Sequence, residues 1–305
     1  MNTSQKTSRH VLAIDIGGSK IICAVVDTSG NIVRSHAQPR ARGDGLDGMM
    51  ATLRACASRV MGSETLAAAG ATVPALADAK RGLWLHAPFS GLANIPMAEL
   101  LRKEFNLPAA IDNDVNACAL AESRFGRCRD IRDFVWVTVS TGVGGAIVAG
   151  GNLHTGSCGT AGEVGHLRVE EDPAKALMCC CGRPGCTEAM ASGTGLERRY
   201  GEPGVSAREI GRRAREGEPK AVEAFRQTGV YLGRAAAICI NLLNPSAVIF
   251  GGGVAMDFDL FSEALQQTCK ERVFSEANPC CVIAPTALGY HAALLGAACL
   301  AMSAS

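Results

Sequence analysis

The chain has 305 residues, a formal net charge of +1 and only 19% charged residues. This balance argues against nucleic-acid binding, which usually needs a basic surface, and no apolar run is long enough to span a membrane. The 14 cysteines follow a polar N-terminus without a secretory leader, so we expect reduced thiols and a cytoplasmic protein. The 48% of hydrophobic residues predicts a substantial core, in one large domain or two.

Strands and helices alternate along the chain, which predicts an α/β fold. From the N-terminus we expect strands at 11–16, 21–26 and 32–35, a helix at 46–60, a strand at 66–73, a helix at 97–104, a strand at 108–111 and a helix at 115–125. Then follow strands at 134–141 and 146–148, helices at 206–215 and 219–242, a strand at 247–250, a helix at 258–269, a strand at 281–284 and a helix from about 291. A strand, a glycine turn and a second strand occur near residue 11 and again near 134, which suggests an internal duplication.

Three glycine turns end apolar strands: Gly17–Gly18, Gly142–Gly145 and Gly251–Gly253. Glycine lets a backbone approach an anion closely, and its amide donates to phosphate oxygens. Tight hairpins also need glycine, but three such turns favour a nucleotide site. A Rossmann turn is disfavoured because strands follow the first two turns, and the Walker spacing is absent.

Three acids lie at the ends of predicted strands. Asp15 precedes the first glycine turn inside an apolar strand, where it either binds Mg²⁺ or caps the amides of the hairpin. Asp112, Asn113 and Asp114 stand at a strand-to-helix junction. They either cap the helix or include a general base for phosphoryl transfer, with Asn113 holding a polyol beside it.

One histidine and three close cysteines lie between two glutamates, Glu163 and Glu188. His166, Cys179, Cys181 and Cys186 match a closed Cys₃His zinc site, and glycines at 182 and 185 supply tight turns. The alternative is a run of small core cysteines, which Cys180 would join. A closed zinc site would hold both glutamates rigidly for another purpose.

Together these motifs resemble the ROK family of repressors, open reading frames and sugar kinases. The resemblance runs from about residue 11 to 301 and rests on Asp15–Lys20, Asp112–Asp114, Ser140–Gly145, Glu163–His166, Cys179–Glu188 and Gly251–Gly253. It implies the actin-like ATPase fold, a duplicated ribonuclease H-like fold with two lobes and a cleft. The expected lobes are 1–117, completed by a C-terminal helix at about 290–305, and 118–289 with the zinc knuckle.

The resemblance also implies the roles of the site residues. Asp114 would be the base, and Asn113, Glu163, His166 and Glu188 would contact sugar hydroxyls. His166, Cys179, Cys181 and Cys186 would hold a structural Zn²⁺. ATP and Mg²⁺ would bind at Asp15, Gly17, Gly18, Ser19, Lys20, Thr141, Gly142, Gly144, Gly145, Gly252 and Gly253.

The resulting prediction is an ATP-dependent kinase of a hexose or N-acetylhexosamine, acting at the 6-hydroxyl. The alternatives are a non-catalytic sugar-sensing regulator of the same family and a zinc-knuckle binding protein without nucleotide chemistry. Too few residues precede Val11 for the DNA-binding domain of the regulators, which favours the kinase. We expect a homodimer that binds sugar and ATP but neither nucleic acid nor membranes. The loop at 87–91 departs from the family pattern, so the identity of the sugar stays open.

Overall fold

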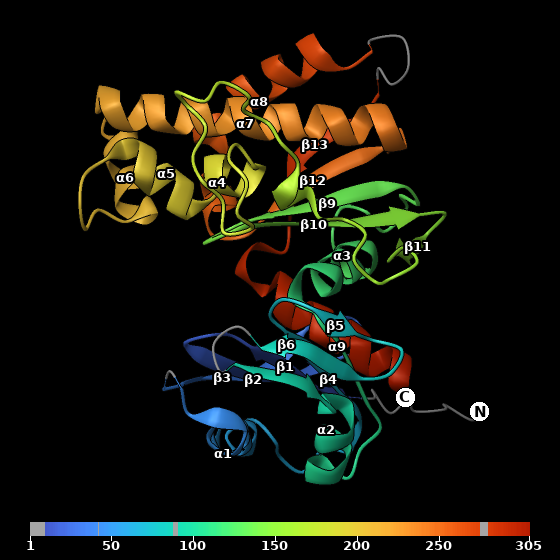
Figure 1. The fold of residues 1–305 in the computed structure, drawn as a ribbon. Coiled ribbons are helices and arrows are strands. Elements are labelled where there is room, and N and C mark those ends of the chain that lie inside the picture. Colours follow the sequence, from blue (N-terminus) through green and yellow to red (C-terminus); the bar gives the residue numbers. More distant parts are fainter. Residues whose placement is uncertain (1–9, 42, 88–90, 275–279) are drawn as a thin grey trace. The chain divides into compact units, whose positions relative to one another are not determined.

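The computed structural model describes residues 10–41, 43–87, 91–274 and 280–305 (Figure 1). The chain forms two compact units: unit 1 is Met1–Phe125 with His291–Ser305, and unit 2 is Gly126–Tyr290. The sequence placed the first boundary near residue 117, inside a helix. Helix α3 (Asp114–Phe125) packs along its length on α9 (Ala292–Ala304), so all of it belongs to unit 1.

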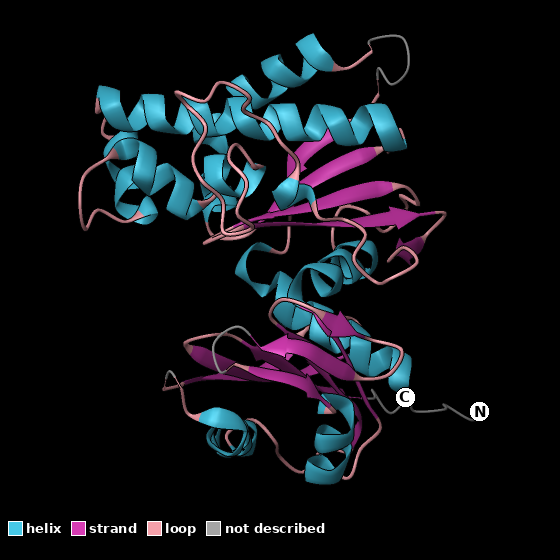
Figure 2. Ribbon diagram, viewed as in Figure 1, coloured by secondary structure: helices cyan, strands magenta, loops and turns pink. Residues whose placement is uncertain are grey.

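Unit 1 contains a five-stranded sheet with helices on both faces (Figures 1 and 2). Its order is β3-β2-β1-β4-β8, made of β1 (His10–Ile16), β2 (Lys20–Asp27), β3 (Ile32–Pro39), β4 (Leu66–Val73) and β8 (Ala109–Asn113). The first three strands form an antiparallel meander, and β4 and β8 continue in parallel from β1. Helices α1 (Gly45–Ser58) and α2 (Met97–Phe105) cover one face, and α9 covers the other.

Unit 2 repeats this sheet. Its order is β11-β10-β9-β12-β13, made of β9 (Phe134–Val139), β10 (Val143–Ala149), β11 (Asn152–His154), β12 (Ala247–Gly251) and β13 (Val282–Pro285). The pairing directions match unit 1, with an antiparallel meander from β9 to β11 and parallel β12 and β13. The order and the directions therefore confirm the duplication that the two strand–turn–strand segments suggested.

The helices of unit 2 lie around one large apolar core. They are α4 (Thr187–Ala191), α5 (Gly193–Tyr200), α6 (Ala207–Arg215), α7 (Pro219–Leu243) and α8 (Phe258–Arg272), with short 3₁₀ turns at Val164–His166, Val254–Asp257 and Gly289–His291. Helix α7 lies against α8, and alanine and glycine on α7 permit the close approach. Within the described residues, none of the helices combines the length and apolar character needed to cross a bilayer.

Most predicted elements agree with the structure to within a few residues, but three groups differ. The strand predicted at 134–141 stops at Val139, and Gly144 and Gly145 lie inside β10, so the second glycine turn comprises only Ser140–Gly142. The sequence did not predict the short strands β5 (Ala77–Asp78), β6 (Leu83–Ala87) and β7 (Leu92–Ile95), nor β11, α4 and α5. The loop at 87–91 falls largely on residues 88–90, which lie outside the described residues.

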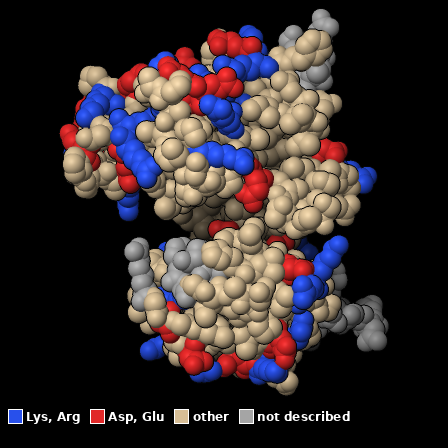
Figure 3. Space-filling model, viewed as in Figure 1, with Lys and Arg blue, Asp and Glu red and all other residues tan. Residues whose placement is uncertain are grey.

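Acidic and basic side chains are intermingled on the face drawn in Figure 3. Some of the charged residues pair with a neighbour on the same helix: on α6 Arg212 contacts Glu209 at 2.7 Å, and on α7 Arg226 contacts Glu223 at 2.6 Å. Such exposed pairs contribute little stability individually, so the fold depends mainly on its two apolar cores.

The contact between β4 and α9 gives a stability test for unit 1. A methyl group added at Gly70 would lie 2.0 Å from the backbone oxygen of Ala297, so Gly70→Ala must displace α9. We expect this change to lower the free energy of unfolding by about 2–3 kcal/mol in urea denaturation. Ala67→Ser, at a half-buried position of the same strand, should stay within about 0.5 kcal/mol. Equal effects of the two changes would contradict the packing constraint.

Candidate active site and metal centre

Asp15 of β1 is paired to the neighbouring strand through its side chain. Its Oδ1 accepts a hydrogen bond of 2.7 Å from the Thr72 hydroxyl of β4. In the turn that follows, the amide of Gly17 donates to the carbonyl of Lys20 at 2.9 Å. Burial raises the pKa of Asp15, an effect that the Thr72 hydrogen bond and Lys20 partly offset. A cation would relieve the cost of burying this charge, so the residue suits Mg²⁺.

The junction between β8 and α3 is held by hydrogen bonds that the side chains of Asp112 and Asn113 accept at the start of the helix. Asn113 accepts a 2.7 Å hydrogen bond from the amide of Asn116, which caps α3. Asp112 is buried and accepts from the amide of Asn113 at 2.7 Å and from the side chain of Asn116 at 3.1 Å. These two residues therefore hold the junction rigid, and the side-chain amide of Asn113 can still face a ligand.

Asp114 is the first residue of α3 and has an unusual pKa. Burial raises the pKa of its carboxyl to about 6, with a further contribution from the negative charge of Asp15. Two hydrogen bonds from the backbone amides of Asp114 and Val115 act in the opposite direction. A half-buried carboxylate with this pKa, held at a rigid helix start, has the properties of a general base at neutral pH.

Unit 2 contains a cavity of about 690 Å³ at the ends of β9 and β12. It is lined by the turn after β9, the N-terminus of α5, α6 and the residues after β12. The lining residues are Ser140, Thr141, Gly193, Thr194, Glu197, Ser206, Ala207, Arg208, Glu209, Arg212, Arg215, Gly253, Val254, Met256, Asp257 and Tyr290. A cavity of this size that opens onto a helix N-terminus suits a nucleotide.

Only two of the residues predicted to bind ATP line this cavity, namely Thr141 and Gly253. The sequence analysis missed the start of α5, where Ser192 caps the helix by accepting from the amide of Gly195 at 3.0 Å. Thr194 is fixed there by a 3.0 Å hydrogen bond to the carbonyl of Thr141. The signal was available, because Ser192 is a typical N-cap residue at the start of the amphipathic segment that forms α5.

The glycines after β9 serve packing within the protein. A methyl group added at Gly142 would lie 2.4 Å from Glu188 Oε2, and one at Gly145 would lie 2.6 Å from the carbonyl of Gly162. Similarly, one at Gly165 would lie 2.0 Å from the carbonyl of Val143. Positions 145 and 165 must be glycine because the backbone of Gly162–Gly165 lies directly on β10, and at Gly142 the Glu188 carboxylate occupies the side-chain space.

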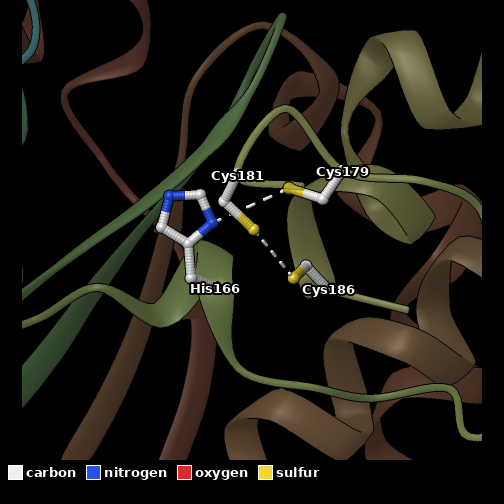
Figure 4. Close-up of side chains that lie close together, drawn as sticks. All are labelled: His166, Cys179, Cys181 and Cys186. Carbon is white, nitrogen blue, oxygen red and sulfur yellow. Dashed lines mark hydrogen bonds between the residues drawn. The ribbon is translucent and has the colours of Figure 1, made fainter. Parts of the chain in front are cut away.

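His166, Cys179, Cys181 and Cys186 converge on one point, as predicted (Figure 4). His166 Nδ1 lies 3.7 Å from Cys179 Sγ, and the sulfurs of Cys181 and Cys186 are 3.6 Å apart. A tetrahedron with Zn–S of about 2.3 Å and Zn–N of about 2.0 Å has edges of roughly 3.5–3.8 Å. These two distances match edges of a zinc tetrahedron, and all four ligand atoms lie within 4.8 Å of one another. The interpretation as core cysteines does not explain the two exposed members, His166 and Cys181.

The two glutamates lie beside this cluster. Glu188 Oε2 accepts from the amide of Val143 at 3.2 Å, and Glu163 Oε2 lies 4.0 Å from His166 Nε2. A metal on Nδ1 of His166 would leave the proton on Nε2, which then faces outward as a donor. The cluster thus presents two carboxylates and one N–H donor, a set suited to sugar hydroxyls.

The paired sheets define an α/β protein with the actin-like ATPase fold in two lobes, and the comparisons with known proteins agree. The model of the ROK family matches residues 11–304, so the chain belongs to the ROK family. It is 32% identical to a glucokinase of Streptomyces coelicolor over 95% of this chain and 96% of that protein. It is 35% identical to an N-acetylmannosamine kinase of Escherichia coli O127:H6 over 80% of this chain and 83% of that protein.

The structure is also similar to that of a ROK family glucokinase from Streptomyces griseus, determined in complex with glucose and AMPPNP. The TM-score is 0.85 at 30% identity, over 96% of this chain and 99% of that chain. The likeness therefore extends over both units.

The zinc knuckle gives a test that does not depend on activity. Cys186→Ala should remove the tightly held zinc and lower the stability of unit 2, because metal binding to the folded state contributes to folding. The loss should be about 3–4 kcal/mol when zinc exceeds its dissociation constant by about 100–1,000-fold. Elemental analysis and thermal unfolding measure both effects. Cys158→Ala, at an exposed cysteine outside the cluster, should change neither, and retained zinc in Cys186→Ala would disprove the ligand set.

Proposed function

We propose that this chain is an ATP-dependent kinase that phosphorylates a hexose or an N-acetylhexosamine at its 6-hydroxyl. The observation that carries the proposal is Asp114, a half-buried carboxylate whose pKa is about 6 at the rigid start of α3. The relatives named above, which are glucokinases and an N-acetylmannosamine kinase, support the substrate class.

The proposed roles divide between the two units. In unit 1, Asp114 is the base and the side-chain amide of Asn113 donates to a sugar hydroxyl. In unit 2, Glu163 and Glu188 accept hydrogen bonds from sugar hydroxyls, and Nε2 of His166 donates. The carboxylate of Glu188 is oriented in advance, because one oxygen already accepts from the amide of Val143. Such orientation before binding lowers the entropy lost when the sugar binds.

ATP is assigned to unit 2 and to the first glycine turn. The cavity lined by Thr141, Thr194 and Gly253 holds the nucleotide. Gly17, Gly18, Ser19 and Lys20 of unit 1 contact its phosphates, as in the sequence prediction, and Asp15 holds Mg²⁺. The magnesium supplies charge stabilisation for the transferred phosphoryl group.

The reaction then follows from these positions. Asp114 accepts the proton of the primary hydroxyl as the oxygen attacks the γ-phosphorus, and ADP leaves in line. The products are a sugar 6-phosphate, ADP and a proton that Asp114 later releases to water. Zinc is structural in this proposal: it fixes the loop that carries Glu163 and Glu188 and contacts neither phosphate nor the attacking oxygen.

Release of ADP over a panel of hexoses and N-acetylhexosamines, with Mg-ATP and zinc-replete protein, tests the function. We expect turnover with one or a few sugars, glucose and N-acetylmannosamine among the first to try. Asp114→Asn should lower kcat by roughly 10³-fold or more while sugar binding, measured by calorimetry, stays within a few-fold. Sugar binding without turnover in the unchanged chain would favour the sugar-sensing regulator. Comparable turnover in Asp114→Asn would remove Asp114 from its role.

The raised pKa of Asp114 predicts the pH dependence of turnover. The base works only when it is ionised, so kcat/KM, which reports the protein before the sugar binds, should be constant above about pH 7 and fall tenfold per unit below about pH 6. An ordinary aspartate would give this decline near pH 4. A pH profile of kcat/KM on the best sugar measures the midpoint, with thermal unfolding at each pH as the control for stability. A midpoint near pH 4 would contradict the assigned environment.

A further inference from the structure

Cys180 is the one cysteine of the Cys179–Cys186 run that the zinc site leaves out, and it is exposed. Its thiol donates to Glu188 Oε1 at 3.1 Å. The sulfur of Cys179 lies 3.9 Å from the same oxygen. Cys179, Cys180 and Glu188 thus form a second group of metal-binding side chains, with all three ligand atoms within 4.8 Å of one another.

The spacing of this group suits a thiophilic divalent cation. In a tetrahedral site with Zn–S of about 2.3 Å and Zn–O of about 2.0 Å, a sulfur and an oxygen stand roughly 3.5 Å apart. The two sulfur-to-oxygen distances, 3.1 and 3.9 Å, lie on either side of this value. Two thiolates and one carboxylate would leave a fourth position for water, whereas the Cys₃His site is closed.

We propose that Cys179, Cys180 and Glu188 form a second site for Zn²⁺ or Cd²⁺, in which the sulfur of Cys179 bridges two metal ions. The second ion takes Glu188 Oε1, and Oε2 keeps its hydrogen bond from the amide of Val143. When the second ion binds, the Cys180 thiol loses its proton to water. The hydrogen bond from this thiol to Glu188 Oε1 is then replaced by a bond from the metal to the same oxygen.

The second ion also inhibits sugar binding, a consequence that rests on the proposed function. Glu188 Oε1 is the oxygen assigned to a sugar hydroxyl, because its partner, the Cys180 thiol, is a weaker donor than the Val143 amide that holds Oε2. A metal on Oε1 therefore competes with the sugar. The first zinc ion fixes the loop that carries Glu163 and Glu188. A second ion, bound when zinc is in excess, occupies Glu188 Oε1 and so prevents the sugar from binding there.

Metal stoichiometry tests the site without using activity. Native mass spectrometry during titration with ZnCl₂, and thiolate-to-metal absorbance during titration with CdCl₂, should show a second equivalent on the unchanged chain. Cys180→Ser should bind one equivalent, since a hydroxyl still donates to Glu188 but is a poor ligand for these metals. The control is Cys158→Ser, at an exposed cysteine outside the knuckle, which should still bind two equivalents of metal.

Three results would overturn the site. One is a single equivalent on the unchanged chain. Another is a second equivalent that Cys180→Ser retains. The third is a second equivalent that appears only with a doubled mass, which would mean that Cys180 bridges two copies of the chain.

Kinetics test the inhibition. With the sugar that supports turnover, the apparent KM should rise about tenfold when free zinc is roughly nine times the dissociation constant of the second equivalent, as simple competition requires. Cys180→Ser should keep its basal activity and lose most of this rise, and the Mg-ATP concentration is held in excess throughout. An unchanged KM with the second ion bound would overturn the inhibition. A chain that binds both ions but phosphorylates no sugar would contradict the proposed function and leave the metal site standing.

Discussion

The contact between β10 and the segment from Gly162 to Glu188 determines most of the candidate site in unit 2. Glycines on both sides allow backbone to touch backbone: Gly145 meets Gly162, and Gly165 meets the carbonyl of Val143. The Glu188 carboxylate fills the space that a side chain at Gly142 would need. Because a methyl group at any of these positions would collide with backbone or with the carboxylate, the loop has one position on the sheet. The positions of the candidate metal ligands and of the two glutamates follow from this packing.

The sequence predicted those features of the structure that depend on residues close together in the chain. The strand at 66–73 and the helix at 97–104 have strong apolar patterns and agree with β4 and α2 almost residue for residue. The cysteine spacing predicted the Cys₃His group because tight turns leave few alternatives. The duplication was visible only as two short segments, and its confirmation needed the strand order, which depends on contacts far apart in the chain.

What the sequence did not predict depends on long-range packing. Strands β5 to β7 are two to five residues long and gain their order from pairing with one another. The cavity in unit 2 draws on α5, α6 and the end of β12, which only the folded chain brings together. The phosphate contacts predicted for Gly142, Gly144 and Gly145 stay a prediction. A sequence does not show whether the space beside a glycine faces a ligand or another part of the protein. The structure places protein atoms in that space at Gly142 and Gly145.

The environment of Asp114 shows how the fold sets the strength of a candidate base. An ordinary aspartate is almost fully ionised at neutral pH but is a weak base, since its conjugate acid is strong. Burial and the charge of Asp15 raise the pKa to about 6, so roughly nine carboxyls in ten are still ionised at pH 7 while the basicity has increased about a hundredfold. A larger shift would gain little, because the ionised fraction would then fall as fast as the basicity rose. The pKa of Asp114 is a balance of two opposing effects at the start of α3. The backbone amides there stabilise the carboxylate, whereas burial and the charge of Asp15 destabilise it.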